Sequence, residues 1–186
     1  KWKEGPGIPF FEKVFDKINS KIILAEDLGE AYKDAKKIRD VFKIPGMKIL
    51  QFSFGNGDPY HEMDQNTVLY TGTHDNSTCI GWFDELLNDK ELNSEKNSIN
   101  LVDEVIKYID YKPSDLIHWN MILYAMSSKA SYCIIPLQEI LGLNDNSRMN
   151  IPGTVGNNWL WRFKKETLTE AIKEKLKLIT KDVNRI

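Results

Sequence analysis

The stretch Thr67-Val-Leu-Tyr-Thr-Gly-Thr-His-Asp-Asn-Ser-Thr78 begins with a short apolar run and continues with small and polar residues. Residues 67–71 have the length and the β-branched character of a buried strand. The polar run that follows leads into a helical pattern at 80–88. A strand, a polar turn and a helix in this order form the repeating unit of parallel α/β folds, which build their sites at the carboxyl ends of the strands.

The same alternation continues on both sides of this stretch. Further strands are predicted from the apolar runs at 21–25, 47–54 and 131–136, and further helices from the periodic patterns at 31–42, 101–109 and 114–129. We therefore predict an α/β fold in which helices pack outside a parallel sheet, and in which residues 1–186 form a single domain.

Two of the predicted helices carry more detail. The helix at 114–129 is expected to bury one face, which contains Leu116, Trp119, Leu123 and Met126. The last helix of the chain is expected to begin at Thr167-Leu-Thr-Glu170, which has the spacing of a capping box.

The composition is that of an ordinary globular protein. Of its 186 residues, 41% are hydrophobic, and 27 acidic residues face 25 basic ones, for a net charge of −2. Acidic and basic residues are interspersed and nearly cancel, so the sequence has no basic stripe that would bind the phosphates of a nucleic acid. Nucleic acid is therefore not an expected partner. No apolar run approaches the ~18 residues of a membrane span, and the first residues lack the apolar core of a signal peptide. Cys79 and Cys133 have no CxxC partner, which suits reduced thiols and a cytoplasmic protein.

Two adjacent carboxylates, Glu26 and Asp27, directly follow the apolar run at 21–25. Carboxylates that share a site repel each other, and burial of one of them favours its protonated form. A carboxyl group that holds its proton at neutral pH can act as a general acid. The same residues also fit a turn in which Asp27 caps the next helix and Gly29 supplies an unusual φ.

His74 and Asp75 lie in the middle of the polar run that follows residue 70. Eight small or polar residues in a row are costly inside a fold unless they line a wet pocket. A histidine can donate to a substrate hydroxyl, and an aspartate can balance a developing positive charge. A structural interpretation stands beside this one, in which Asp75, Asn76 or Ser77 caps the helix that begins near Ile80. The two interpretations do not exclude each other.

A third polar segment covers residues 144–154 and includes Arg148-Met-Asn-Ile-Pro-Gly-Thr154. Its arginine and amide side chains suit a polyhydroxylated ligand, although taken alone the segment fits a plain surface loop better. Trp159 and Trp161 follow it and could stack on sugar rings, while core packing explains most of the other tryptophans.

Several other kinds of site have no support in the sequence. His61-Glu62 and His74-Asp75 lack the HExxH spacing of a zinc site, so no metal is predicted. The chain contains no GxGxxG or Walker loop, no Gly-x-Ser-x-Gly elbow and no reactive-cysteine signature, so no cofactor is predicted either.

Taken in order, seven segments of the chain resemble the 4-α-glucanotransferases, also called amylomaltases or disproportionating enzymes, which form glycoside hydrolase family 77. The segments are Trp2-Lys-Glu-Gly-Pro-Gly7, Ile23-Leu-Ala-Glu-Asp-Leu-Gly29, Pro45-Gly-Met-Lys-Ile-Leu-Gln-Phe52, Val68-Leu-Tyr-Thr-Gly-Thr-His-Asp-Asn76, Ile135-Pro-Leu-Gln-Glu-Ile-Leu-Gly-Leu143, Arg148-Met-Asn-Ile-Pro-Gly-Thr154 and Gly156-Asn-Asn-Trp-Leu-Trp-Arg162. Together they span essentially the whole chain. The resemblance implies a TIM (β/α)₈ barrel, of which this chain looks like the carboxyl-terminal half, strands five to eight.

The resemblance also implies roles for individual residues. Glu26 matches the general acid/base, and Asp75 matches a carboxylate that stabilises the transition state. His74 matches a residue that binds sugar hydroxyls, and Asp58 and Asn150 match loop positions that contact substrate. The family's nucleophile lies after the fourth strand in a motif of the type Arg-Ile-Asp-His-Phe, and no aspartate of this chain has that context.

The implied activity is the retaining transfer of α-1,4-glucan segments between maltooligosaccharides. The expected partners are α-1,4-glucans and the missing amino-terminal half of the barrel. Without that half, the inward faces of the strands at 22–25 and 47–54 would lack an opposite wall, which favours association. The chain is thus expected to be a fragment that is inactive alone. A glucan-binding half-barrel without chemistry, and a half that complements a separate chain, are the alternatives.

Overall fold

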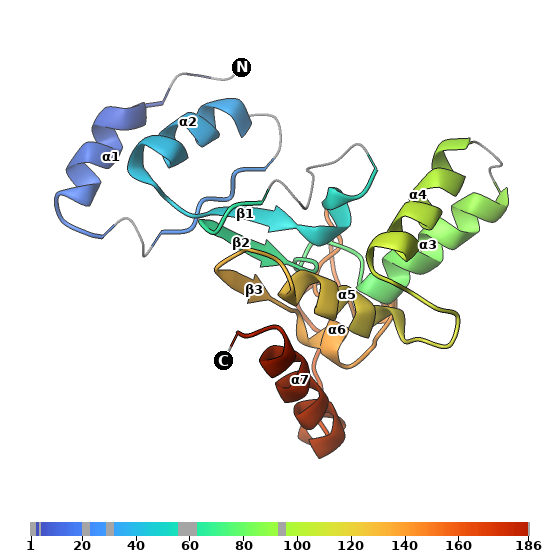
Figure 1. The fold of residues 1–186 in the computed structure, drawn as a ribbon. Coiled ribbons are helices and arrows are strands. Elements are labelled where there is room, and N and C mark those ends of the chain that lie inside the picture. Colours follow the sequence, from blue (N-terminus) through green and yellow to red (C-terminus); the bar gives the residue numbers. More distant parts are fainter. Residues whose placement is uncertain are drawn as a thin grey trace.

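The computed structural model describes residues 3, 5–19, 23–28, 32–55, 63–92 and 96–185. In this part of the chain, three parallel strands form one sheet in the order β1-β2-β3, with the helices around it (Figure 1). The predicted α/β fold with a parallel sheet is therefore confirmed. Because the three strands run in the same direction, their carboxyl ends lie along one edge of the sheet.

The central strand is β2 (Thr67–Tyr70), which ends where the polar run begins. Val68 and Leu69 are both buried, so both faces of this strand are covered, as in other parallel sheets. On one side β2 pairs with β1 (Gly46–Ile49), with Met47 opposite Val68. On the other side it pairs with β3 (Tyr132–Ile134), with Leu69 opposite Cys133.

The strand predicted at 47–54 is wrong in its second half. After Ile49 the chain turns into a short 3₁₀ helix, η2 (Leu50–Ser53). Leu50 is fully buried in the core, and the amide of Gln51 donates to the carbonyl of Ser77 at 2.8 Å. The apolar run therefore serves both a strand and a turn, which hydrophobic pattern alone does not separate.

The strand predicted at 21–25 is also wrong in its described part. Residues 21 and 22 lie outside the described residues, and residues 23–28 belong to no strand. The N–H of Ala25 donates to the carbonyl of Pro45 at 2.8 Å, beside the start of β1. Proline has no N–H with which to continue a ladder of hydrogen bonds at this point.

The helices form the outer layers of the molecule. In chain order they are α1 (Gly7–Phe15), α2 (Tyr32–Phe42), α3 (Cys79–Leu92), α4 (Lys96–Tyr108), α5 (Ile117–Met126), α6 (Leu137–Ile140) and α7 (Glu170–Asp182), with two short 3₁₀ turns, η4 (Asp145–Ser147) and η5 (Lys165–Thr167). The helices predicted at 31–42, 80–88, 101–109 and 114–129 are confirmed, although α3 and α4 are longer than expected and α5 is shorter. Within the described residues, none of the helices has the length and apolarity needed to cross a membrane.

The face predicted for the 114–129 helix is only half correct. Trp119 and Met126 are buried, whereas Leu116 and Leu123 are 60% and 43% exposed. The reason is that α5 lies between two apolar clusters. Met121 and other residues pack toward β2, α3 and α4, while Trp119 and Met126 pack toward α7. A helix with neighbours on two sides does not show a single apolar stripe.

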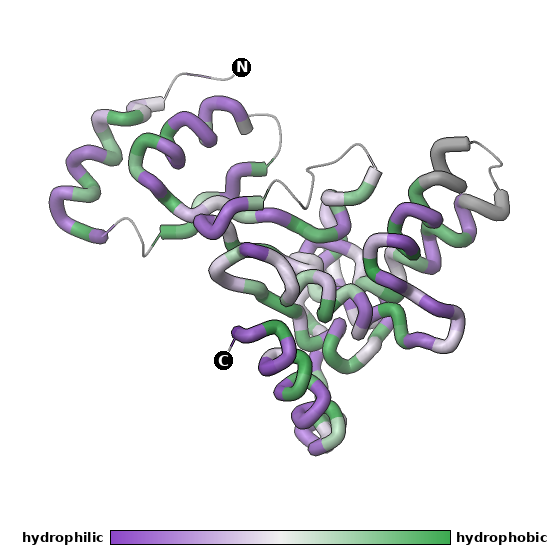
Figure 2. Tube along the Cα trace, viewed as in Figure 1, coloured by the Kyte–Doolittle hydropathy of each residue, from purple (hydrophilic) through white to green (hydrophobic). Residues whose placement is uncertain are grey.

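The last helix, α7, is amphipathic, and Figure 2 shows hydrophobic and hydrophilic residues alternating along it. Its apolar side packs on α5 through Ile172, Leu176 and Ile179. The predicted cap at Thr167 is wrong, since Thr167 lies in η5 and its hydroxyl donates to the carbonyl of Lys164. The hydroxyl of Thr169 caps the helix instead, because it accepts from the N–H of Ile172.

Candidate functional site

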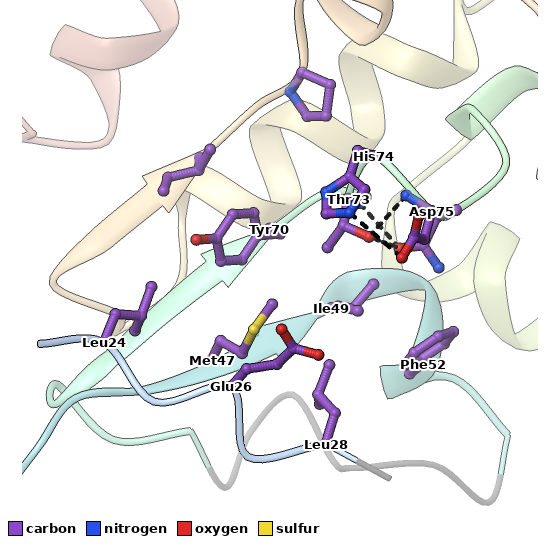
Figure 3. Close-up of a pocket in the computed structure, with 14 residues that line it drawn as sticks. Leu24, Glu26, Leu28, Met47, Ile49, Phe52, Tyr70, Thr73, His74 and Asp75 are labelled. Atoms are coloured by element: carbon purple, nitrogen blue, oxygen red, sulfur yellow. Dashed lines mark hydrogen bonds and ion pairs between the residues drawn. The ribbon is translucent and has the colours of Figure 1, made fainter. Parts of the chain in front are cut away.

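A pocket of about 610 Å³ opens at the carboxyl ends of the three strands. Figure 3 shows side chains from residues 23–28, from β1 and η2, and from the loop after β2 around it. Its polar groups include Glu26, His74 and Asp75, and its walls include Ile49 and Tyr70. The three polar residues come from two segments that lie nearly 50 positions apart in the chain, and the fold brings them to one cavity.

Glu26 projects into this pocket from the extended segment 23–28 (Figure 3). Its side chain is exposed, so it is in contact with the space where a ligand would lie. Burial raises the pKa of Tyr70, and the negative charge of Glu26 raises it further. Glu26 and Tyr70 are thus close enough at the end of β2 for the charge of one to affect the pKa of the other. Tyr70 was not predicted as a site residue, because an aromatic residue at the end of a strand is usually part of the core.

The carboxylate next to it, Asp27, is the buried one of the pair, with an exposed fraction of 1%. It forms an ion pair with Arg39 of α2 and accepts a hydrogen bond from the N–H of Met47 at 2.9 Å. The buried carboxylate of the pair is thus Asp27, and both of its oxygen atoms have donors in neighbouring elements. Asp27 ties the segment 23–28 to β1 and α2, and the start of the helix that it was expected to cap lies outside the described residues.

We expect removal of the guanidinium in Arg39→Met to lower the free energy of unfolding by about 3 kcal/mol, because the buried Asp27 charge then lacks its partner. The measurement is urea unfolding of this chain followed by tryptophan fluorescence. Lys37→Met is the matched control, since Lys37 pairs with Asp34 on the exposed side of the same helix. That substitution should change the free energy of unfolding by less than about 1 kcal/mol. Equal effects of the two substitutions would contradict the assignment.

The loop between β2 and α3 holds His74 and Asp75 at the mouth of the pocket. Thr73 donates to the Asn76 side chain from its N–H at 2.9 Å and from its hydroxyl at 2.6 Å, which closes the turn. The ring nitrogen Nε2 of His74 lies 3.4 Å from a carboxylate oxygen of Asp75, and about half of each side chain is exposed. The two side chains therefore face solvent as a pair of hydrogen-bonding groups.

None of the residues proposed as a cap for the following helix has that role. Helix α3 begins at Cys79, and the hydroxyl of Thr78 accepts from the N–H of Gly81 at 3.1 Å. The cap is thus Thr78, the last residue of the polar run. Asp75 is consequently available for ligand chemistry.

The third polar segment folds over the loop that carries Asp75. The amide of Asn150 donates to the Asp75 carboxylate at 2.6 Å, across 75 positions of sequence. The guanidinium of Arg148 donates to the main-chain carbonyl of Asp75 at 2.9 Å and to the hydroxyl of Ser77 at 3.2 Å. Asn150 therefore contacts a side chain of the site, whereas Arg148 stabilises the loop through the main chain of Asp75 and the hydroxyl of Ser77.

Trp159 extends this arrangement on the outer side. Its ring centre lies 5.0 Å from that of His74, and the side chain is 53% exposed. Its backbone has a φ of +63°, a left-handed conformation that bulky residues adopt rarely, and its N–H donates to the carbonyl of Met149. An exposed aromatic ring next to hydroxyl-binding groups suits stacking on a sugar ring.

Three of the five predicted site residues, Glu26, His74 and Asp75, thus line one pocket. A fourth, Asn150, is bonded to Asp75. Asp58 lies outside the described residues. Among the residues that the structure describes, no cluster of three His, Cys, Asp or Glu side chains is placed to hold a metal ion. The site is built from carboxylates, an imidazole, amides and aromatic rings, and such groups recognise hydroxyl-rich ligands.

Comparison with known proteins gives a consistent result. A family model described as 4-alpha-glucanotransferase matches residues 1–169. The 4-alpha-glucanotransferase of Synechocystis sp. is 38% identical over 185 residues, which are 96% of this chain and 34% of that protein. The chloroplastic/amyloplastic 4-alpha-glucanotransferase of Solanum tuberosum is 40% identical over 171 residues, which are 90% of this chain and 28% of that protein.

Solved structures agree with the sequence relatives. An amylomaltase from Streptococcus agalactiae, in complex with acarbose, superposes with a TM-score of 0.86 at 33% identity, covering 99% of this chain and 36% of that one. Amylomaltase from Corynebacterium glutamicum superposes with a TM-score of 0.56 at 16% identity, which shows a shared fold. The chain spans about a third of the length of the relatives it matches.

Proposed function

The chain belongs to the 4-alpha-glucanotransferase family, and from this premise we propose that it carries the acid/base side of a site that transfers α-1,4-glucan segments between maltooligosaccharides. The observation that carries the proposal is the meeting of Glu26, His74 and Asp75 around one open pocket at the carboxyl ends of the strands. The acarbose in the related amylomaltase structure supports a glucan-like ligand.

In the proposed mechanism, Glu26 protonates the glycosidic oxygen that leaves, while a carboxylate attacks the anomeric carbon and forms a glycosyl-enzyme. Glu26 then takes the proton from a sugar hydroxyl as that hydroxyl attacks the anomeric carbon and releases the carboxylate. Asp75 balances the positive charge that develops on the sugar ring. Its bond from Asn150 and its nearness to His74 support a fixed orientation.

The nucleophile is the part of this mechanism that we assign to residues beyond the present sequence. Glu26 and Asp75 are already used, and Asp27 is tied to Arg39. We further propose that residues 1–186 form one domain, the carboxyl-terminal half of a (β/α)₈ barrel with strands five to eight. Its partner would be the amino-terminal half. The exposed Leu24, Phe52 and Ile134 around the pocket support an apolar partner surface there.

A second function is a half-barrel that binds glucan or completes another chain without chemistry of its own. The observation in its favour is the exposed aromatic ring of Trp159 beside His74, since a binding module needs a stacking platform and hydroxyl-binding groups only.

The experiment that tests the proposal uses a hybrid enzyme, defined as the Streptococcus agalactiae amylomaltase with this chain in place of the segment that it matches. Incubated with maltotriose, the hybrid enzyme should release glucose and form longer maltooligosaccharides. The same amylomaltase with the segment deleted is the control and should form neither. A hybrid enzyme that binds acarbose but forms no product would contradict the catalytic proposal and favour the binding function.

A further inference from the structure

A buried carboxyl group lies beneath the loop that carries His74 and Asp75, and neither proposed function uses it. Glu139, in the short helix α6, is 2% exposed. Carboxylates are rarely buried to this extent without a specific partner, because the charged form loses its hydration. The partners of Glu139 therefore indicate what the protein uses it for.

Glu139 contacts both ends of the loop. Its Oε2 atom accepts a hydrogen bond from the N–H of Cys79, the first residue of α3, at 2.9 Å. Its Oε1 atom lies against Gly72 at the other end, where a Cβ atom would come within 3.3 Å of it. One carboxyl group thus lies close to both ends of the loop, at Gly72 after β2 and at Cys79 at the start of α3.

Two other side chains from different elements reach the same loop. Gln51 of η2 donates to the carbonyl of Ser77 at 2.8 Å. Asp145 of η4 accepts from the N–H and the hydroxyl of Thr78, at 2.8 and 3.1 Å. Gln51 also lies close to Gly72, where a Cβ atom would come within 3.2 Å of its amide nitrogen, so Gln51 and Glu139 both reach the two ends of the loop. Of the two, only Glu139 accepts from the N–H of the first residue of α3 in the described part of the chain.

The space above Glu139 leads to the candidate site. A cavity of about 190 Å³ is lined by Glu139 together with Thr73, His74 and Trp159. Glu139 thus lies beside the same cavity as His74, although the two side chains come from different elements.

We propose that Glu139 is a positioning residue for the transferase site, which holds the two ends of the loop together and so sets where His74 and Asp75 lie. This inference rests on the proposed function. Displacement of a reacting group by about 1 Å can lower a rate by about a hundredfold. A positioning role therefore predicts a large effect from a residue that touches neither substrate nor the reacting atoms.

The protonation of Glu139 supports this role. Burial raises its pKa to about 7, hydrogen bonds from the thiol and N–H of Cys79 oppose the rise, and the charge of Asp145 adds to it. The charged and titratable groups near it are Cys79 of α3 and Asp145 of η4, together with His74 and Arg148, which line the same cavity. The folded-state pKa lies above the ordinary value of 4.5, so the stability that the bound proton contributes is present below pH 4.5 and is lost as the pH rises to about 7.

The test is made in the hybrid enzyme with three substitutions. Glu139→Ala should lower kcat for transfer from maltotriose by about a hundredfold and change KM by less than about threefold. Glu139→Gln keeps the shape and an acceptor oxygen, so it should restore kcat to within about fivefold of the parent. In the parent, kcat should fall as the pH rises through about 7, because Glu139 then ionises near the charge of Asp145. In Glu139→Gln this fall in kcat should be absent, because Gln does not ionise. Asp115→Asn is the matched control, since Asp115 accepts from the N–H of Lys112 and the amide of Asn120, both outside residues 72–79, and it should leave kcat unchanged.

Hydrogen exchange of the amides gives a readout that does not depend on catalysis. In Glu139→Ala, residues 72–79 should exchange at least about tenfold faster, while residues 117–126 of α5 keep their protection. Loss of protection in both segments, or a kcat equal to that of the parent, would overturn the positioning role. Absence of transfer in the unsubstituted hybrid enzyme would instead contradict the proposed function, and the exchange measurement would still decide the role of Glu139.

Discussion

Replacing Glu26 by Gln in the hybrid enzyme is expected to lower the rate of transfer from maltotriose by about 10²–10⁴-fold, the usual contribution of a general acid or base. Gln has nearly the same shape and cannot donate the proton that the leaving glycosidic oxygen needs. Glu26 faces the pocket with an exposed side chain, so the substitution should leave folding unchanged. The measurement is glucose release at pH 7 with saturating maltotriose.

A substrate with a better leaving group makes this prediction specific. Fluoride leaves α-maltosyl fluoride without needing a proton, so formation of the glycosyl-enzyme from this substrate should be slowed much less by Glu26→Gln. Glu166→Gln, which changes an exposed glutamate in η5, is the control and should have no effect on either substrate. Equal slowing of both substrates by Glu26→Gln would show that Glu26 is not the acid.

This chain by itself is expected to show no disproportionation of maltotriose. The reason is that the mechanism needs a nucleophilic carboxylate, and no aspartate of this chain lies in a motif of the type Arg-Ile-Asp-His-Phe. Asp27 pairs with Arg39, Asp40 also contacts Arg39, and Asp16 lies at the end of α1. Removal of the nucleophile eliminates the covalent intermediate on which the retaining pathway depends.

Glucose release is the measurement here as well, against a control without protein. The hybrid enzyme at the same molar concentration is the positive control, so that lack of product from the chain cannot be due to the assay. Glucose formed by the chain alone and abolished by Glu26→Gln would contradict the prediction. It would mean that a carboxylate within residues 1–186 is the nucleophile.

Much of the fold was predictable because it depends on local patterns. The β2 strand, the polar loop with His74 and Asp75, and the α3 helix follow one another in the chain, and each leaves a recognisable pattern in a short stretch of residues. The family was identified from such stretches too, and the match over residues 1–169 confirms it.

The errors have physical causes that a local pattern does not contain. At 21–25 the apolar residues predicted a strand, but the chain beside Pro45 has no ladder to join. At 50–53 the run continued as a turn because Leu50 and Gln51 have partners in the core and in the loop after β2. Leu116, just before α5, and Leu123 within it are exposed because the buried side chains of α5 face two separate clusters, which its own sequence does not reveal.

The sequence by itself determined the chemistry that is available, namely the carboxylates Glu26 and Asp75 and the imidazole of His74, and it placed His74 and Asp75 directly after a strand. Only the tertiary structure decided how these groups are held. Asn150 bonds to Asp75, Arg39 pairs with Asp27, and Glu139 bonds to Cys79, across 75, 12 and 60 positions of sequence. A strand or helix depends mainly on residues within one or two turns of it, whereas a hydrogen bond between distant side chains forms only where the packing of whole elements brings the two atoms within about 3 Å.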